Sequence, residues 1–573
     1  MVGLGIVMAA SRRGRLIPTG GRAHLVDLSR RSQQVLGVAG LVGVVVGLVV
    51  AGFERVTADV VFEQVLDLPL AVQAGAPAVG LAVTAVVLRL GGPSASASTS
   101  DDYIRAFHDS RGGRLRLRDV PVKLLAAVAT LGTGAPLGYE GPAIYAGASI
   151  GAAAQRRLAR LFSAEQAKVL MVAGAAAGVA AVFKAPVTGL VFAMEVPFQD
   201  DLARRMVLPA AISSAASYVT FAALAGTEPL LPVAGRPPFN LVDLGGAAVI
   251  GLVAGVLARL FVVLIREAKR LSGRGHPVLR IAVAGSILAA VVVAGDSLGD
   301  GPLGLGPGYN ALRWALEPQH SVVAIIALGT LRVVGTAAAV GGGGTGGLFI
   351  PLVIQGALVG RAVGGVFDME GTSLFPVVGM AAFLGAGYRV PLAAVVFVAE
   401  FTGQPGFVVP GLIAAVVAQL VMGRSSISPY QAAGRAGHLE RRLQLPLASV
   451  VDAEARTVPP DATIEELFWQ HLIGRRQQSV PVVDGDTYLG MAEAHRLAEI
   501  DRAAWPTTTV AQAMRTGPPI AGPEWLLSEA IQAMETADSD RLAVCDAGRF
   551  IGVITAADLV RLDEILDATE EER

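Results

Sequence analysis

The segment Gly138-Tyr139-Glu140-Gly141-Pro142 places a single acidic side chain inside a long apolar, glycine-rich stretch. No other charged residue lies between Lys123 and Arg156. A carboxylate at membrane depth is energetically unfavourable, and such residues commonly mark an ion or substrate pathway. Glu140 is therefore the first candidate functional residue. The alternative is a structural acid that pairs with a base from another part of the chain.

The composition around this segment is typical of a polytopic membrane protein. The 573 residues have a mean hydropathy of +0.57, with 53% hydrophobic and 16% charged residues. Residues 35–52, 68–88 and 207–226 carry no charge. Each run reaches or nearly reaches the length of about 20 apolar residues that a membrane-crossing helix needs. Shorter runs at 244–258 and 281–294 are predicted to be half-helices that line a protein-walled cavity.

The amino-terminal segment is basic, which predicts a cytoplasmic N-terminus by the positive-inside rule. Six arginines precede the first apolar run: Arg12, Arg13, Arg15, Arg22, Arg30 and Arg31. The pattern does not indicate a cleaved signal peptide. The single cysteine, Cys545, excludes an intrachain disulfide and a cysteine-cluster metal site. Because no His-Glu-x-x-His pattern and no nucleophile–base pair emerges, we predict no metal site and no enzymatic activity.

The apolar part of the chain contains an internal duplication. Residues 183–195 and 388–400 each read aromatic, base, any residue, proline, apolar stretch, glutamate, and the copies lie 205 residues apart. A second pair of motifs lies upstream at a spacing of 209 residues: Pro142, Gly147 and Gly151 match Pro351, Gly356 and Gly360. In membrane transporters such duplications often have inverted topology, with the substrate site between the two halves.

The upstream motif of the second copy, Gly347-Leu348-Phe349-Ile350-Pro351, follows the glycine-rich run 341–346. Glycine allows close approach of the backbone and proline suits a first helical turn, so we expect a helix to begin here. The first turn carries free N–H groups and a partial positive charge. The amides of Phe349 and Ile350 are therefore predicted to face an anion. The run lacks the Gly-Lys-Ser/Thr ending of a nucleotide-binding P-loop, which excludes that kind of site.

These motifs resemble those of the CLC family of chloride channels and chloride/proton exchangers, over nearly all of residues 30–440. The Glu140 segment matches the family's G-[KR]-E-G-P, with tyrosine at the position of the base, and the Phe349 segment matches G-x-F-x-P. Lys123 and Tyr430, the latter at the position of a late pore tyrosine, also match. The resemblance implies a polytopic α-helical membrane protein with a CLC-type inverted repeat and many tilted and broken helices. It also implies a homodimer with one pore per subunit.

The resemblance further implies roles for individual residues. Glu140 is expected to be the gate: when ionised, its carboxylate competes with the anion for a pore site, and when protonated it loses that competition and swings away. Gly141, the amides of Phe349 and Ile350, and the Tyr430 hydroxyl are expected to contact the anion. For Tyr430 the alternative is an interfacial tyrosine near the membrane surface.

One segment departs from the family pattern. Where the family has G-S-G-I-P, this chain has Ser98-Thr99-Ser100-Asp101-Asp102. Thr99 stands at the position of the central serine, and its hydroxyl is expected to contact the anion. Acids beside an anion site disfavour the anion unless they point away or are paired, so the two aspartates put the anion preference in question. The alternative is a flexible polar loop.

A second departure concerns proton coupling. Family exchangers generally carry an internal glutamate directly after the position of Glu195, whereas this chain has Val196 there, as in the family's channels. Valine cannot carry a proton. The leading hypothesis is therefore passive, gated chloride conduction across the membrane through a pore gated by Glu140. The alternatives are a chloride/proton antiporter that lacks the internal glutamate, and a membrane-anchored nucleotide-sensing regulatory protein.

The last part of the chain has the composition of a soluble domain and also contains a duplication. Residues 479–490 and 541–552 each predict a strand, an Asp/Gly turn and a second strand. This region resembles a pair of α+β CBS domains, and Thr555 and Asp558 fit that family's G-x-[IV]-[ST]-x-x-D segment. The resemblance implies an adenosine nucleotide bound at Thr555 and Asp558. The alternative is a dimer-stabilising module without a ligand.

The predicted organisation has six parts: a cytoplasmic N-terminal segment (1–34), a transmembrane CLC anion-transport domain (35–430), a linker (431–446), a first CBS domain (447–505), a second CBS domain (506–566) and a tail (567–573). We expect a multi-pass homodimer in the plasma (inner) membrane, with the N-terminus and the CBS tail in the cytoplasm. The expected partners are chloride as substrate and membrane lipid, and no nucleic acid.

Overall fold

The structure is a computed structural model, and it divides the chain into two compact units, Met1–Gly434 and Arg435–Arg573, which are described separately. It describes residues 19–92, 95–109, 115–159, 162, 168–203, 206–228, 230–231, 240–299, 301–317, 320–366, 374–432, 445–451, 455–473, 479–497, 499–517, 520–537, 541–555 and 558, with side chains from residue 33 onward. The side chains of the six amino-terminal arginines, most of the predicted linker and the predicted tail lie outside these residues.

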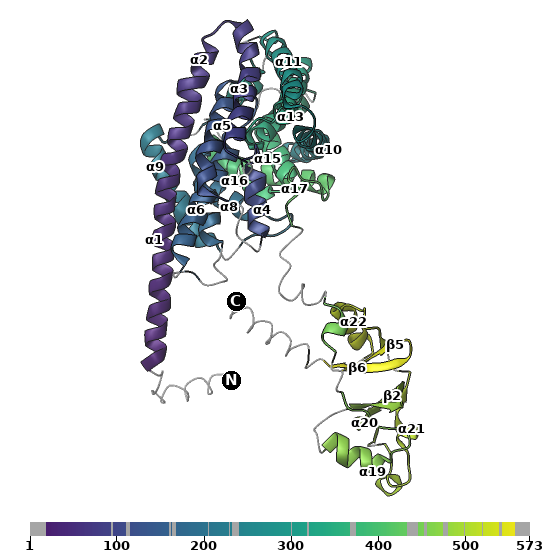
Figure 1. The fold of residues 1–573 in the computed structure, drawn as a ribbon. Coiled ribbons are helices and arrows are strands. Elements are labelled where there is room, and N and C mark those ends of the chain that lie inside the picture. Colours follow the sequence, from purple (N-terminus) through teal and green to yellow (C-terminus); the bar gives the residue numbers. More distant parts are fainter. Residues whose placement is uncertain are drawn as a thin grey trace, which may run out of the picture. The chain divides into compact units, whose positions relative to one another are not determined.

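The first unit is built from helices. Its first half contains α1 (Thr19–Arg55), the π-helical η1 (Val56–Phe62), α2 (Glu63–Leu66), α3 (Leu70–Leu90), α4 (Ser100–His108), α5 (Val120–Gly132), α6 (Glu140–Arg157), α7 (Val169–Phe183), α8 (Pro186–Glu195) and α9 (Val207–Ala225). Its second half contains α10 (Leu241–Ser272), α11 (Pro277–Asp296), α12 (Tyr309–Leu316), α13 (Val322–Gly341), α14 (Phe349–Val366), α15 (Leu374–Tyr388), α16 (Pro391–Thr402) and α17 (Val408–Met422). Figure 1 shows α1 as one long helix at the margin of this unit, where it packs against α9.

Several helices have the length and surface of membrane spans. Among the described residues, eight helical segments are long and apolar enough to cross a membrane by length and composition. Large apolar side chains on the outward faces of three of them are exposed: Leu41 on α1 is 67% exposed, Val79 on α3 62% and Leu224 on α9 64%. Such an extensive apolar surface needs lipid or another apolar partner around it, so the chain is a multi-pass membrane protein.

The prediction of half-helices for the two shorter charge-free runs is wrong. Residues 244–258 lie within α10, which has 32 residues, and residues 281–294 lie within α11, which has 20. In α10 the helix continues through charged residues such as Arg259 and Arg266, so the absence of charge marks only part of it. The short apolar helices are instead α7, α8, α15 and α16, which have between 10 and 15 residues.

The core of the unit is formed by α7 and α15, which occupy equivalent positions in the two copies of the repeat. Every residue of both helices is buried. Glycine permits this packing, because a Cβ atom on Gly147 would lie 2.1 Å from the Gly174 carbonyl oxygen, and one on Gly356 would lie 2.2 Å from that of Gly379. The backbones of α6 and α7 therefore touch directly, and those of α14 and α15 do the same.

The two copies of the downstream motif contact each other, because the glutamate near the end of each helix reaches the first turn of the other. Glu195, at the end of α8, accepts hydrogen bonds from the Leu392 and Ala393 amides in the first turn of α16, at 3.1 and 2.8 Å. Glu400 of α16 accepts from the Val187 and Thr188 amides in the first turn of α8, at 3.0 and 2.7 Å. This reciprocal capping requires α8 and α16 to run antiparallel, as an inverted repeat predicts.

The second unit is a mixed α+β fold with one sheet. Its strands are β1 (Ser479–Asp484), β2 (Thr487–Glu493), β3 (Arg515–Thr516), β4 (Ile520–Ala521), β5 (Arg541–Asp546) and β6 (Arg549–Thr555), in the order β1-β2-β6-β5-β4 with β3 on β2. Its helices include α19 (Ile464–Glu466), which continues into η8 (Leu467–Ile473), α20 (Ala494–Leu497), α21 (Val510–Ala513) and α22 (Leu527–Thr536). The antiparallel hairpins β1-β2 and β5-β6 have matching registers, each with one bulge, as the duplicated strand–turn–strand pattern predicts.

Candidate functional site

The Glu140 carboxylate lies at the start of α14. Glu140 is the first residue of α6 and its side chain is fully buried. Its Oε1 atom accepts a hydrogen bond of 2.6 Å from the backbone N–H of Phe349, the first residue of α14, and the Ile350 amide also faces this carboxylate. The first turn of a helix presents free N–H groups and a partial positive charge. The backbone amides at the start of α14 therefore hold a negatively charged group here.

Two glycines make room for this carboxylate. The segments before α6 and α14 pair through two backbone hydrogen bonds, from Gly138 N–H to Gly347 O at 2.9 Å and from Gly347 N–H to Gly138 O at 2.7 Å. A Cβ atom on Gly138 would lie 1.9 Å from Glu140 Oε2, and one on Gly347 would lie 1.9 Å from Oε1. Any other residue at either position would displace the side chain of Glu140.

The structural alternative for Glu140, pairing with a base, has no support in the described part of the chain. The described residues place no lysine, arginine or histidine side chain within salt-bridge distance of its carboxylate. Its Oε2 atom is buried and has no hydrogen-bond partner among them. Glu140 is thus held only by backbone amides and keeps one oxygen free of any direct partner.

A third helix start joins the first two. Thr99 directly precedes α4, and its hydroxyl donates a hydrogen bond of 3.2 Å to the Gly346 carbonyl oxygen. A Cβ atom on Gly141 would lie 2.5 Å from the same hydroxyl oxygen. The structure thus brings Thr99, Gly141 and Phe349 together around Glu140. From Ser100 onward the segment is helical, so the alternative of a flexible polar loop is wrong for this part of it.

The two aspartates that follow Thr99 are both paired. The Lys123 ammonium group lies 2.6 Å from Asp102 Oδ2 and also donates to the Ser98 carbonyl oxygen at 2.5 Å. The Lys269 ammonium group of α10 lies 2.6 Å from Asp101 Oδ2. Each carboxylate therefore has a cationic partner, which offsets its repulsion of a nearby anion.

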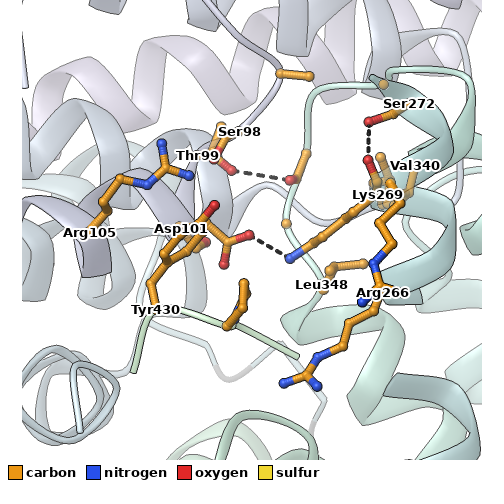
Figure 2. Close-up of a pocket in the computed structure, with 18 of the residues that line it drawn as sticks. Ser98, Thr99, Asp101, Arg105, Arg266, Lys269, Ser272, Val340, Leu348 and Tyr430 are labelled. Carbon is orange, nitrogen blue, oxygen red and sulfur yellow. Dashed lines mark hydrogen bonds and ion pairs between the residues drawn. The ribbon is translucent and has the colours of Figure 1, made fainter. Parts of the chain in front are cut away.

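A pocket of about 410 Å³ opens beside these helix starts. It is lined by Thr99, Asp101 and Leu348, and by basic side chains that include Arg266 and Lys269 of α10. Figure 2 shows Asp101 reaching across to Lys269. The surplus of cationic side chains over acids at this pocket favours the entry of anions.

Tyr430 lines this pocket but lies at its exposed edge. The residue is 39% exposed, and the guanidinium carbon of Arg105 lies 4.1 Å from the centre of its ring. In Figure 2 Tyr430 and Arg105 lie together on the α4 side of the pocket. The structure thus places Tyr430 at the pocket, but more exposed than the buried residues around Glu140.

Comparison with known proteins places the fold. A family model described as voltage gated chloride channel matches residues 79–423, and a CBS domain model matches residues 510–564. This chain belongs to the voltage-gated chloride channel family, the CLC family. Its membrane unit and its second unit thus have the fold class that the sequence motifs predict.

Known CLC relatives resemble most of the chain. The H(+)/Cl(-) exchange transporter ClcA of Salmonella arizonae is 29% identical, covering 72% of this chain and 89% of the relative, and ClcA of Citrobacter koseri is 28% identical with the same coverage. Among solved structures, a slow cyanobacterial Cl-/H+ antiporter has a TM-score of 0.60 at 23% identity, covering 68% of this chain and 94% of that one. A CLC-type fluoride/proton antiporter gives 0.58 at 22%, covering 70% and 98%, and a eukaryotic CLC transporter gives 0.56 at 18%, covering 92% and 98%.

In this CLC chain the residue after Glu195 is buried. Val196 is 1% exposed, and its carbonyl oxygen accepts a hydrogen bond of 2.8 Å from the Gln431 side chain. The same amide group donates to the carbonyl oxygens of Phe198 and Tyr388, at 3.3 and 2.7 Å. Gln431 thus fixes the backbone here, and Val196 contributes no titratable group.

Sequence reasoning missed two residues of the pocket, Lys269 and Tyr388. The Asp101–Lys269 pair joins residues 168 positions apart, and only the fold reveals it. Tyr388 stands in the duplicated motif as its aromatic position, where the first copy has Phe183. The difference between phenylalanine and tyrosine at that position was a visible signal of a polar role.

The candidate nucleotide residues of the CBS region cap a chain turn. The Thr555 amide and hydroxyl both donate to Asp558 Oδ2, at 2.9 and 2.6 Å, and the Asp558 amide donates to the Thr555 hydroxyl oxygen at 3.2 Å. This reciprocal arrangement is a capping box, which stabilises the chain without a ligand. The two polar groups lie together, as the nucleotide hypothesis also requires.

Proposed function

We propose that this CLC protein conducts chloride passively across the membrane, with the Glu140 carboxylate as its gate. One observation carries the proposal: a buried carboxylate with no cationic partner among the described residues accepts a hydrogen bond of 2.6 Å from the first amide of α14. A negative group held in this way occupies a binding position for anions. The ClcA relatives are H(+)/Cl(-) exchange transporters, which supports chloride as the substrate.

Gating follows from competition for the amides of α14. The ionised carboxylate and a chloride ion both need these donors, and their mutual repulsion prevents them from sharing the position. Protonation removes the negative charge of Glu140, so the carboxyl group binds the helix start more weakly and leaves it. Flux is then expected to rise as the pH falls.

The remaining candidate residues supply contacts along the path. Phe349 and Ile350 donate their amides where the carboxylate now lies, and Gly141 leaves the backbone free to approach. The Thr99 hydroxyl lies beside Gly141 and would contact the ion after releasing the Gly346 carbonyl oxygen, and Tyr430 contacts the ion at the pocket entrance. These contacts are weak and several, which lets an ion both bind and leave.

Chloride/proton exchange is a second candidate function. The names of the relatives favour it, because the ClcA proteins are exchangers. The buried, apolar Val196 favours conduction, because it cannot relay protons. Exchange would require a proton route to Glu140 that bypasses Val196.

The deciding experiment measures anion flux from liposomes that contain the purified full-length protein, with and without an imposed proton gradient. A conducting pore has a reversal potential set by chloride alone, and a pH gradient leaves it unchanged. A reversal potential that moves with the pH gradient would establish exchange instead. Absence of any chloride flux would reject both, and nucleotide binding without flux would favour the regulatory protein.

We further propose that the protein is a homodimer in the plasma (inner) membrane, with the N-terminus and the second unit in the cytoplasm. The CBS resemblance supports an adenosine nucleotide on the second unit, at Thr555 and Asp558. Titration of the full-length protein with ATP by calorimetry tests this, with Thr555→Ala as the variant expected to weaken binding. No measurable heat with the wild-type protein would contradict nucleotide binding.

A further inference from the structure

Tyr388 lines the pocket from its inner wall. It is the last residue of α15 and is only 2% exposed, in contrast to Tyr430 at the exposed edge. The polar neighbours of its hydroxyl group are the Ser100 side chain at the start of α4 and the Leu348 backbone just before α14. Its hydroxyl thus lies where two helix starts meet.

Ser100 provides a second hydroxyl at the same place. The residue is 7% exposed and lines the pocket, and apart from the neighbouring Tyr388 hydroxyl its buried Oγ atom has no hydrogen-bond partner in the described part of the chain. A buried hydroxyl without a partner is unfavourable, and native proteins retain few of them. An ion or a water molecule in the pocket would satisfy it.

The surroundings fix the Tyr388 ring in place. Phe192 packs edge-on against it, with ring centres 5.7 Å apart and planes at 83°. The Tyr388 carbonyl oxygen accepts a hydrogen bond of 2.7 Å from Gln431. The next residue, Arg389, has a φ of +56° and an ion pair of 2.6 Å with Asp200. A hydroxyl held this rigidly is presented at a defined point, as a selective site requires.

We propose that the hydroxyl groups of Tyr388 and Ser100 donate hydrogen bonds to the permeating anion beside Leu348 and determine which anions the pathway prefers. This inference rests on the proposed function, because it assigns residues to the same anion pathway. Strongly hydrated anions such as chloride need donors that replace their water, whereas thiocyanate sheds its water readily. Loss of either hydroxyl therefore weakens the binding of chloride more than the binding of thiocyanate.

The test compares Tyr388→Phe with Tyr218→Phe of α9, a tyrosine that does not line the pocket, in the full-length protein. Each change removes one hydroxyl group and keeps the ring. Chloride binding is measured by calorimetry on purified protein, and the preference for chloride over thiocyanate by efflux from liposomes. We expect Tyr388→Phe to weaken chloride binding about tenfold, the effect of losing one hydrogen bond to a charged group. Tyr218→Phe is expected to change it by less than about twofold, because this residue lies outside the pocket.

Gel filtration and thermal unfolding show whether Tyr388→Phe folds. If it does not, Ser100→Ala still tests the proposal. It is expected to lower the chloride preference in the same direction. The loss of chloride affinity in the double variant should be smaller than the product of the two single-variant losses, because both groups contact one ion. Unchanged chloride binding and preference in either well-folded single variant would overturn the proposal. A wild-type protein without chloride binding or flux would instead reject the proposed function itself.

Discussion

At the scale of single residues, the Glu140 carboxylate is the feature from which the other proposals follow. It is buried, it contacts backbone amides, and no base among the described residues neutralises it. A group in that setting changes its interactions strongly when it gains a proton, because only the charged form repels an anion. Its protonation state is therefore expected to control flux.

Glu140→Gln should make chloride flux insensitive to pH. Wild-type flux is expected to rise as the pH falls, because protonation of Glu140 opens the pathway, whereas glutamine is neutral at every pH. The ratio of flux at pH 4.5 to flux at pH 7.5 should therefore fall to about one in the variant. Liposome efflux at a series of pH values measures this, with the exposed Glu317→Gln as the control. A pH dependence that survives in Glu140→Gln would show that another group is the gate.

Gly138→Ala should act through Glu140. The nearest atoms to a Cβ at position 138 all belong to the Glu140 side chain, the closest at 1.9 Å. The methyl group should displace the carboxylate from α14 and lower stability by about 1–3 kcal/mol. Thermal unfolding of Gly138→Ala and of Gly138→Ala with Glu140→Ala tests the cause.

Removal of the Glu140 side chain should relieve the clash, so the alanine at position 138 should be nearly harmless in the double variant. Equal destabilisation by Gly138→Ala in both backgrounds would place its effect elsewhere in the backbone.

At the scale of elements, the start of α4 combines a helix N-terminus with two ion pairs. The sequence placed two aspartates beside a presumed anion site but could not show their partners. Asp102 pairs with Lys123 of α5, and Asp101 pairs with Lys269 of α10, on the other half of the repeat. Partners so distant in sequence are brought together only by the packing of whole helices, which no local pattern specifies.

Lys269→Met should impair anion conduction by leaving Asp101 without its cation. The Asp101 side chain is 13% exposed, so its charge is only partly screened by water. We expect chloride affinity to fall about three- to tenfold, measured by calorimetry. Arg270→Met is the control, because it removes a cation from the same helix but leaves the Asp101 pair intact.

Restoration of affinity in the double variant with Asp101→Asn would confirm that the unpaired carboxylate is responsible. A similar loss in Arg270→Met would instead indicate a general effect of positive charge at the pocket.

The helix lengths show what local patterns could and could not predict. Charge-free runs identified the candidate spans α1, α3 and α9, because each of these helices contains a run of about 18–20 residues without charge. The same criterion made α10 too short, because Asp243 in its first turn and Arg259 in its middle bound the charge-free run. Charge in a membrane helix reports on local surroundings and does not mark where the helix stops.

At the scale of the whole molecule, the duplicated motifs predicted the architecture well. The spacing of 205 residues relates Glu195 to Glu400, and the structure shows each glutamate capping the helix of the other copy. Fold class and family could be predicted from the sequence, because the backbone requires glycine, proline and glutamate at the repeated positions where helices start or pack closely. Tyr388 and Lys269 were not, because their roles depend on which side chains meet across the two halves.

The two units should be separable in function. Each has its own hydrophobic core, and the chain divides at Gly434. A chain shortened to residues 1–434 is expected to keep chloride flux within about twofold of the full-length protein, because every residue proposed to contact the anion lies in the first unit. Efflux from liposomes at matched protein content measures this. Loss of flux in a well-folded shortened chain would give the second unit a direct part in conduction.

A seam of two backbone hydrogen bonds between Gly138 and Gly347 joins each motif to its counterpart in the other copy, 209 residues away. This seam lies directly beside the Glu140 side chain, the proposed gate. Any rocking of one half against the other would have to break both bonds of the seam, and the amide that holds the carboxylate would move with them. The architecture thus favours a transport cycle in which the two halves stay hydrogen-bonded to each other and only the Glu140 side chain moves.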